Sequence, residues 1–371
     1  MTPSAPSNDE DSTPRESAAW ATAFGWDDSF ERSFVASTGR DLVPGRVLGE
    51  YRGGFRVATS EGVVAAEVSG KMRYEALDRS DMPVVGDWVA LSGRAIQAVL
   101  ARRSVFRRLD PGGGEQLLAA NVDLAFLVMS LNRDFNLRRL ERYLTVVWSS
   151  GAQPVVLLSK ADLATDLDQR LAEVRLIAAG APVLAVSIPL GQGLDDVRSH
   201  LAPARTAVFL GSSGVGKSTL INTLAGRTRQ AVAEIRAEDD RGRHTTTGRE
   251  LITLPGGWLV IDTPGLRGIG LTDADIDAGL DRVFADIDEL AATCRFTNCS
   301  HENEPGCAIR AAVDEGRLDP DRLASHLKLT REAERASVAT VRGARAANRS
   351  KWRAIVRSAN QQTDRKYGKD R

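Results

Sequence analysis

Short apolar runs alternate with glycine and turn residues between about residue 42 and residue 110. The runs cover the segments Arg46–Tyr51, Phe55–Ser60, Val63–Val68, Asp87–Leu91 and Ala95–Leu100. Their spacing of about ten residues is typical of a small closed sheet. We expect residues 42–110 to form an OB-like β-barrel that the stretch Arg102–Arg108 closes. The arginines around Phe106 are either an RNA contact or a charged strand edge that opposes aggregation.

The pattern changes after Pro111–Gly114, which resembles a linker. Val122–Leu131 is a continuous apolar run, as expected for a strand of a parallel sheet that is buried on both faces. Apolar residues then recur at helical spacing from Leu137 to Val147. Strand and helix patterns go on alternating in the segments Pro154–Ser159, Leu167–Ile177, Val183–Ser187, Ala207–Leu210, Lys217–Gly226, Glu250–Leu254 and Trp258–Asp262. The alternation predicts a doubly wound α/β domain over residues 117–280.

The two ends of the chain differ from the domains between them. Residues 1–41 combine an acidic, Ser- and Pro-rich leader, expected to be disordered, with a short amphipathic helix over 20–35. Residues 281–371 are helix-like in sequence and are expected to form a mostly helical domain. From residue 341 onward they carry ten Lys or Arg against two Asp. This tail is either a basic arm for phosphate backbones or a solvated helix.

Overall composition sets broad limits. The 371 residues suffice for two or three domains, and 49 Lys and Arg balance 49 Asp and Glu. The start of the chain has no apolar signal segment, and no run approaches the roughly 18 apolar residues that cross a bilayer. We therefore expect a cytoplasmic protein without membrane contact. We expect a monomer, because neither heptads nor a long exposed apolar face are visible.

Residues Gly211–Ser218 match the phosphate-binding loop pattern GxxxxGK[ST] at every fixed position. The match follows an apolar strand and precedes a helical pattern, which is the context that such a loop needs. Backbone N–H groups of the loop are expected to surround phosphates at the N-terminus of the helix. Lys217 should reach the β- and γ-phosphates, and the Ser218 hydroxyl should bind Mg²⁺. The residues assigned to nucleotide binding here are Gly211, Ser212, Ser213, Gly214, Val215, Gly216, Lys217, Ser218 and Thr219.

Asp262-Thr263-Pro264-Gly265 follows an apolar strand and fits DxxG, the motif that senses the γ-phosphate. Asp262 is expected to reach Mg²⁺ through water, and the Gly265 amide is expected to contact the γ-phosphate. The segment Arg241–Gly248 lies between the two phosphate motifs and holds three threonines. One of them should bind Mg²⁺. The pattern does not say which, and we prefer Thr246.

Ser159-Lys160-Ala161-Asp162 is similar to the base-reading motif NKxD of GTPases, with Ser in place of Asn. The Asp162 carboxylate can accept hydrogen bonds from guanine N1 and N2, which adenine cannot supply. Ser187 is expected to complete the base pocket through its backbone. In ordinary GTPases this motif follows the phosphate loop, but here it precedes the loop. The order predicts a circular permutation, which keeps the sheet and moves the chain ends.

The residue after DxxG is Leu266, where many GTPases carry a Gln that orients the attacking water. A leucine cannot do this. We expect slow intrinsic hydrolysis that a partner accelerates, with His244 or the partner supplying the missing group.

All three cysteines of the chain lie in one short segment together with a histidine: Cys294, Cys299, His301 and Cys307. An odd, clustered set of cysteines in a cytosolic chain indicates a metal site rather than disulfides. Three thiolates and one imidazole suit a closed tetrahedral Zn²⁺ site with no open position. We expect one structural Zn²⁺.

Together these motifs resemble the RsgA family of circularly permuted GTPases, which assist small ribosomal subunit biogenesis. The resemblance covers about residues 42–330. It rests most on the segments Pro83–Trp88, Ala120–Asp123, Asp134–Asn136, Gly211–Thr219, Gly242–Thr246, Asp262–Gly265 and Cys294–Cys307, the last including Glu304-Pro305-Gly306.

The resemblance implies an OB barrel, a permuted GTPase core and a C-terminal zinc domain. It implies binding to the immature small subunit and its rRNA near the decoding region. Subunit-stimulated conversion of GTP to GDP would serve late maturation and release of another factor. In the family the histidine of the GRHTT segment is catalytic, and the match here is His244. Ser159 departs from the family's Asn or Thr, which bears on nucleotide affinity.

Three hypotheses accompany this interpretation. Leu266–Leu290 would carry the state of the second switch into the zinc domain. The chain could instead be an RNA-binding module that uses nucleotide as a switch with negligible turnover, which Leu266 and Ser159 motivate. An enzyme that uses ATP is the other alternative, and Asp162 argues against it.

Overall fold

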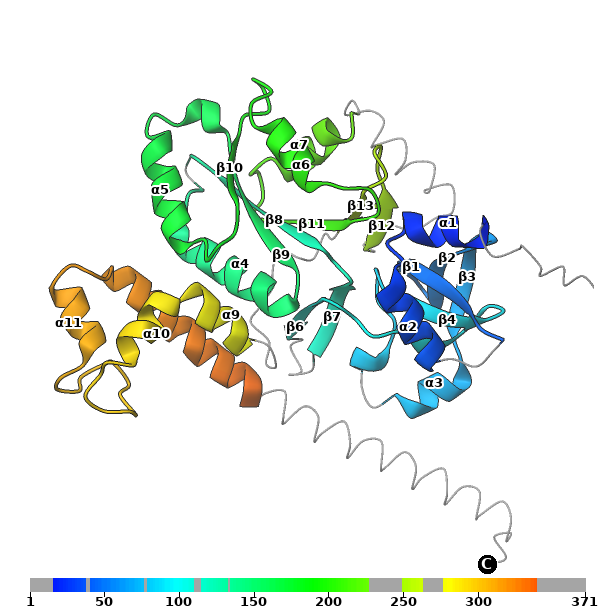
Figure 1. Cartoon of the computed structure of the whole chain (residues 1–371), viewed down its shortest axis with the longest axis horizontal. Coiled ribbons are helices and arrows are strands. Elements are labelled where there is room, and N and C mark those ends of the chain that lie inside the picture. Colours follow the sequence, from blue (N-terminus) through cyan, green and yellow to red (C-terminus); the bar gives the residue numbers. More distant parts are fainter. Residues whose placement is uncertain are drawn as a thin grey trace, which may run out of the picture.

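The computed structural model describes residues 16–37, 41–76, 79–109, 115–132, 134–226, 249–262 and 276–338. Among the predicted positions, His244, Thr246, Gly265 and Leu266 lie outside these ranges, as does the start of the Leu266–Leu290 connection. Figure 1 shows three regions: the barrel in blue, the α/β region in cyan and green, and the C-terminal helices in yellow and orange. The predicted combination of a barrel, a doubly wound sheet and a helical C-terminal region is confirmed.

Five strands form the barrel: β1 (Val43–Tyr51), β2 (Gly54–Thr59), β3 (Gly62–Val68), β4 (Trp88–Ser92) and β5 (Ala95–Val99). They pair in the order β1-β2-β3-β5-β4, and β4 returns to β1, which closes the sheet. The short helix α3 (Gly70–Glu75) and the 3₁₀ turn η1 (Arg79–Asp81) lie between β3 and β4. Val47, Val57 and Ile96 fill the interior and are fully buried.

The predicted closure of the barrel by Arg102–Arg108 is wrong. Val105–Leu109 is strand β6, which pairs with β7 (Glu115–Ala120) in a separate two-stranded sheet. The barrel does not need this segment because β1 is long enough to pair twice. Its first half pairs with β4, and its second half pairs with β2.

The N-terminal segment forms two helices where the pattern predicted one over 20–35: α1 (Glu16–Ala23) and α2 (Asp28–Ser37). Asp27 starts the second helix, since its Oδ1 accepts from the backbone N–H of Ser29 at 2.9 Å. The apolar positions face the barrel as an amphipathic pattern requires. Trp26 and Phe30 both contact Trp88, which is fully buried.

The α/β region has five parallel strands, in the order β10 (Val183–Val186), β9 (Gln153–Ser159), β8 (Leu124–Ser130), β11 (Thr206–Leu210) and β13 (Leu259–Asp262), with β12 (Glu250–Thr253) antiparallel at the end. Strand β8 is buried along its whole length. Its side chains alternate between two cores, one beneath α4 (Leu137–Ser150) and α5 (Leu167–Ile177) and one beneath α6 (Leu194–His200) and α7 (Lys217–Leu224). Helices on both faces make the sheet doubly wound.

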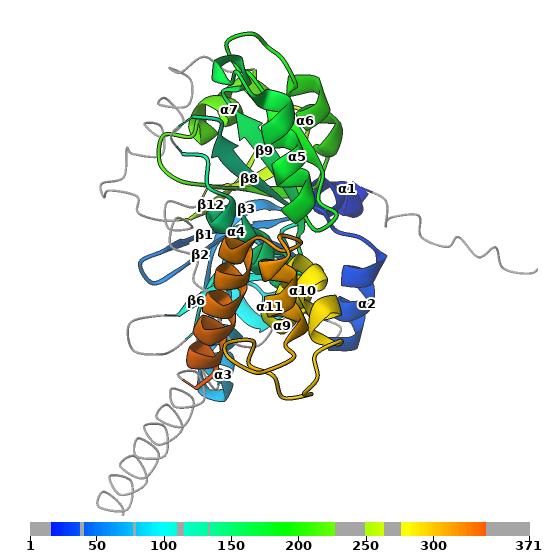
Figure 2. The ribbon, with the colours of Figure 1, turned by 90° about the vertical axis from the view of Figure 1, so that its left-hand side faces the viewer.

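The C-terminal region packs against α4. Its helices are α9 (Ile276–Val283), α10 (Ala285–Ala291), α11 (Ala308–Asp314) and a final helical stretch over residues 320–338. Leu280 and Phe284 join Leu140 and Leu144 of α4 in one buried cluster. Figure 2 shows the same helices beside α4 from a second direction.

Buried polar groups join the barrel to the α/β sheet. The Arg46 guanidinium donates to the Asn121 carbonyl oxygen at 3.3 Å and to Thr206 Oγ1 at 3.2 Å. Burial lowers the pKa of Arg46 to about 10, which still leaves the group charged at neutral pH. The Asn121 side chain donates to the Gly86 carbonyl oxygen and accepts from the Arg103 N–H. Strands β1 and β12 also pair, so that barrel and α/β region share one sheet.

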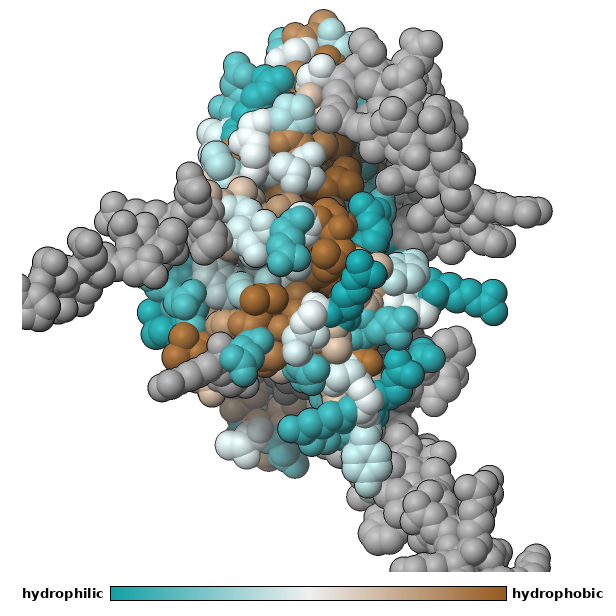
Figure 3. Space-filling view, turned by 90° about the vertical axis from the view of Figure 1, so that its right-hand side faces the viewer, coloured by the Kyte–Doolittle hydropathy of each residue, from teal (hydrophilic) through white to brown (hydrophobic). Residues whose placement is uncertain are grey.

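Figure 3 shows the side of the molecule that carries the barrel, where an apolar band runs between polar side chains. Large apolar side chains exposed in and around the barrel include Val43, Val63 and Tyr74. Within the described ranges, no helix is both long and apolar enough for a membrane crossing.

Candidate nucleotide site and metal cluster

The phosphate-loop match connects β11 to α7, as the sequence pattern predicts. Gly211, Gly214 and Gly216 have positive φ angles of 145°, 82° and 98°. Residues with side chains rarely adopt such angles, so the loop depends on its glycines. Gly211 also lies directly against the backbone of Val128 on β8, where a Cβ atom would collide with the carbonyl oxygen. The loop is therefore a compact turn fixed on the central strands.

Lys217 is the first residue of α7, and its side chain folds back over the loop. Its Nζ donates to the carbonyl oxygens of Gly211 at 2.7 Å and Ser212 at 2.6 Å. The ammonium is thus held above the loop, near the N-terminus of a helix, where anions are favoured. Ser218 and Thr219 follow on α7 and are exposed, as are Ser213 and Gly214. A ligand could reach this edge of the loop.

The base-reading segment contacts the phosphate loop directly. Ser159 ends β9, and its Oγ donates to the Val215 carbonyl oxygen at 2.7 Å. The next residue, Lys160, has a φ of 61° and donates from Nζ to the Gly214 carbonyl oxygen at 3.1 Å. Two motifs about fifty residues apart are joined because parallel strands end at the same edge of the sheet. One hydrogen bond therefore connects the Ser159 side chain to the phosphate loop.

Asp162 and Ser187 also come together. The Ser187 hydroxyl donates to Asp162 Oδ1 at 2.6 Å, and Ser187 is fully buried. The Ser187 backbone N–H and C=O pair with Gln192. The Ser187 hydroxyl thus faces Asp162, and the contact of the Ser187 backbone with the base stays a prediction. The contact fixes one carboxylate oxygen and sets the direction of the other.

Asp262 is the last residue of β13, which pairs in parallel with β11. It therefore lies at the same strand edge as the phosphate loop. The rest of this motif lies outside the described residues, as does the segment with His244 and Thr246.

Sequence reasoning gave no role to Asp134, although it belongs to a segment that carries the family resemblance. Its carboxylate accepts a hydrogen bond from the Ser212 hydroxyl at 2.6 Å. The available signal was its position, because a carboxylate just after β8 must lie at the edge where neighbouring β11 meets the loop.

Cys294, Cys299, His301 and Cys307 lie together as predicted, with all four candidate ligand atoms within 4.8 Å of one another. His301 Nδ1 is 3.7 Å from Cys294 Sγ and 3.6 Å from Cys307 Sγ, and these two sulfurs are 4.0 Å apart. Zn–S bonds of about 2.3 Å in a tetrahedron place ligand atoms about 3.5–3.8 Å apart. The spacing and the ligand types therefore fit a Zn²⁺ ion.

The loop that carries the cysteines is shaped by Glu304. Its carboxylate accepts from the hydroxyl and the N–H of Ser300 and from the N–H of Glu302. The hydrogen bonds from Ser300 lower the pKa of Glu304 to about 2. The loop connects α10 to α11, and Cys307 is the residue just before α11. A metal held here would tie these two helices together.

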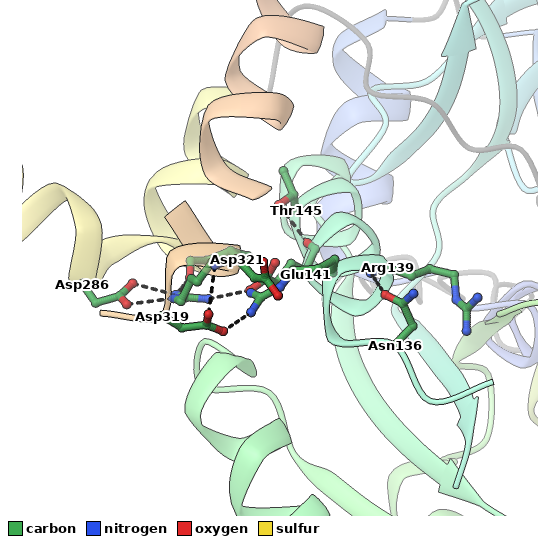
Figure 4. Close-up of polar contacts among 10 residues, drawn as sticks. Asn136, Arg139, Glu141, Thr145, Asp286, Asp319 and Asp321 are labelled. Atoms are coloured by element: carbon green, nitrogen blue, oxygen red, sulfur yellow. Dashed lines mark hydrogen bonds and ion pairs between the residues drawn. The ribbon is translucent and has the colours of Figure 1, made fainter. Parts of the chain in front are cut away.

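Charged residues dock the C-terminal helices on α4 (Figure 4). Arg322 donates to Glu141 Oε1 at 2.9 Å and to both carboxylate oxygens of Asp286, at 2.6 and 2.8 Å. Arg138 bridges Glu141 and Asp319. Glu141 is fully buried. Burial opposes ionisation of Asp286, but the hydrogen bond and charge of Arg322 outweigh it and lower the pKa of Asp286.

Comparison with known proteins agrees with this architecture. Residues 99–272 match the family model described as RsgA GTPase. A Lactiplantibacillus plantarum protein named small ribosomal subunit biogenesis GTPase RsgA 2 is 48% identical over 297 residues, 78% of this chain and 83% of the relative. The RsgA of Opitutus terrae is 44% identical over 350 residues, 90% of this chain and 95% of the relative.

Two solved structures share the fold. YjeQ from Thermotoga maritima aligns with a TM-score of 0.58 and 24% identity over 79% of this chain and 98% of its own. YloQ, described as a circularly permuted GTPase, aligns with a TM-score of 0.52 and 25% identity over 81% and 98%. The permuted motif order of this chain has a counterpart in a solved structure. On the identity and coverage of its relatives, the chain belongs to the RsgA GTPase family.

Proposed function

We propose that this protein hydrolyses GTP, binds the small ribosomal subunit and assists its late maturation. Hydrolysis is stimulated by the subunit and linked to release of a factor. The observation that carries the GTP assignment is the contact between two motifs. Ser159 and Lys160 hold the phosphate loop, and Ser187 orients the carboxylate of Asp162 in the same base-reading segment. The ribosomal part rests on relatives named small ribosomal subunit biogenesis GTPases.

We assign the following roles at the site. Asp162 reads guanine, and Lys217 with the loop N–H groups binds the β- and γ-phosphates. Ser218 and Thr246 hold Mg²⁺, which would neutralise phosphate charge when bound with the nucleotide. Asp262 would reach Mg²⁺ through water, and the Gly265 amide senses the γ-phosphate. His244 positions the attacking water, because the apolar Leu266 cannot.

The remaining proposals concern the domain bounds, the cellular location, the oligomeric state and the partner. The domains are the leader and helices (1–41), the barrel (42–110), the GTPase domain (117–280) and the zinc-binding domain with its basic tail (281–371). The protein acts as a cytoplasmic monomer that contacts rRNA. The ribosomal subunit is the partner that accelerates hydrolysis.

Phosphate release from GTP, measured with and without purified small ribosomal subunits, tests the proposal. We expect slow release alone, strong stimulation by subunits, and loss of both on Lys217→Ala. Leu176→Ala, at an exposed position on α5, is a control that should leave release unchanged. Tight GTP binding without turnover in either condition would instead favour the RNA-binding switch module.

The four cysteine and histidine ligands are proposed to hold one structural Zn²⁺. Elemental analysis should give one zinc per chain, and Cys299→Ser should lower this content. Hydrogen exchange in α10 and α11 should rise in the same variant, because metal binding contributes folding free energy. Thr297→Ala, in the same loop, should change neither. Full zinc loss with unchanged exchange would contradict a structural role.

A further inference from the structure

The turn between β8 and α4 is built from polar side chains that fix its shape. Asn132 Oδ1 accepts from the Ser130 hydroxyl at 2.7 Å and from the Asp134 N–H at 3.3 Å. Asn136 Oδ1 then accepts from the Arg139 N–H at 2.9 Å, which caps α4. Asp134 therefore lies between a hydrogen-bonded turn at Asn132 and the capped start of α4 at Asn136. Its side chain is only 24% exposed.

The two carboxylate oxygens of Asp134 have different partners. Oδ2 accepts from the Ser212 hydroxyl at 2.6 Å, and Oδ1 pairs with the Arg139 guanidinium at 2.8 Å. Arg139 also donates to the backbone carbonyl oxygen of Asp134. A lone carboxylate beside a phosphate-binding loop would repel the ligand. The ion pair with Arg139 reduces that repulsion and leaves the hydrogen bond to Ser212 in place.

Ser212 is consequently fixed at two points. Lys217 holds its carbonyl oxygen, and Asp134 holds its hydroxyl. The neighbouring residue Gly211 can adopt backbone conformations that other residues avoid. An unrestrained loop with such a glycine therefore loses much conformational entropy when it becomes ordered. A loop already ordered loses less entropy when it binds phosphates.

We propose that Asp134 is a positioning residue of the phosphate loop, and that it acts through the Ser212 hydroxyl to order the N–H groups that receive the nucleotide phosphates. The inference rests on the proposed function in one respect, namely that the ligand is a guanine nucleotide. Asp134 itself does not touch the ligand. Asp134 therefore changes the affinity for nucleotide, and we expect the same change for GDP and for GTP.

A double-mutant cycle on the full-length protein tests the proposal, with the dissociation constant of a fluorescent GDP analogue as the measurement. Asp134→Ala and Ser212→Ala should each weaken binding about fivefold, the effect of one lost hydrogen bond. The double variant should be no weaker than about fivefold, because both changes remove the same contact. Asp134→Asn keeps an acceptor oxygen and should stay within about twofold of the wild type.

Arg142→Ala is the matched control, since Arg142 lies on α4 but pairs with Glu332. It should leave GDP binding unchanged. Should Asp134→Ala fail to fold, Ser212→Ala and Asp134→Asn still give the comparison. Unchanged binding by Ser212→Ala, or an additive loss of about 25-fold in the double variant, would overturn the role of Asp134. A wild-type protein that binds no guanine nucleotide would overturn the proposed function itself.

Discussion

Single hydroxyl groups determine how the base-reading segment is held. Ser159 stands where the motif usually has Asn, yet its hydroxyl still reaches the Val215 carbonyl oxygen of the phosphate loop. Ser187 uses its hydroxyl on Asp162. Both serines are buried. The hydrogen bond from Ser159 to Val215 is buried at both ends and is shielded from bulk water, whereas the one from Ser187 to Asp162 is only partly buried. With Ser in place of the family's Asn or Thr, the segment thus keeps a hydrogen bond to the phosphate-binding loop.

Ser187→Ala is expected to weaken GDP binding by about fivefold while ADP binding stays the same. The reason is that the variant loses only the hydrogen bond that orients the Asp162 carboxylate, and the effect of one such bond is about 1 kcal/mol. Competition of GDP and ADP against a fluorescent nucleotide measures this. Ser199→Ala, on the exposed side of α6, is the control. Equal losses for GDP and ADP would show that Ser187 supports the site as a whole and not base selection.

At the scale of elements, α4 is the part that connects the candidate nucleotide site to the C-terminal helices. The turn that leads into α4 carries Asp134, which contacts the phosphate loop, and Asn136, which caps the helix. Its middle carries Glu141, which meets Arg322. The turn before α4 and the body of α4 therefore contact two different parts of the molecule, so a displacement of this helix would change the contacts in both parts. This route lies within the described residues, whereas the predicted connection through Leu266–Leu290 begins outside them.

Arg322→Ala should destabilise the folded protein by about 3 kcal/mol. The variant removes one of the two guanidinium groups that neutralise the buried Glu141 carboxylate. Chemical denaturation with a probe of C-terminal unfolding measures the effect. Arg317→Ala breaks an exposed pair with Glu315 and should cost less than about 1 kcal/mol. Comparable losses in the two variants would mean that the ion-pair network does not hold the C-terminal helices on α4.

At the scale of the whole molecule, barrel and α/β region form one connected body. The sheet runs without interruption from β10 to β4. Asn121 bonds to Gly86 at the junction, and Gly86 lies against the Ala120 carbonyl oxygen. The two segments that carry the family resemblance here, Pro83–Trp88 and Ala120–Asp123, meet in space. Their role in this structure is to join domains.

Gly86→Ala should destabilise both regions together. A Cβ atom at this position would lie 2.1 Å from the Ala120 carbonyl oxygen, and its φ of 90° is unfavourable for alanine. We expect a loss of more than about 2 kcal/mol, in a single transition that includes the barrel. Gly62→Ala is the control. Gly62 has a φ of 105° and no neighbour within 4 Å of an added Cβ atom, so this variant introduces backbone strain without a steric clash. A similar loss of unfolding free energy in both variants would mean that backbone strain, and not the contact between barrel and α/β region, causes the effect.

Local patterns were sufficient for most elements of the fold. The five barrel strands and the strands of the α/β sheet were located to within a few residues, because alternation, apolar runs and turn residues act over short distances. The motifs of the nucleotide site and the cysteine cluster were visible for the same reason. Failures occurred where long-range pairing decides. The Arg102–Arg108 segment is strand-like, but only its partner strand determines which sheet it joins.

The sequence by itself determined the element types, the permuted motif order and the four candidate metal ligands, since each depends on residues close together in the chain. Tertiary structure alone decided that β1 closes the barrel, that Asp134 reaches Ser212, and that Arg322 reaches Glu141. These contacts join residues that are far apart in the chain. Their geometry follows from how the sheet and helices pack, and no short-range pattern of polar and apolar residues encodes it.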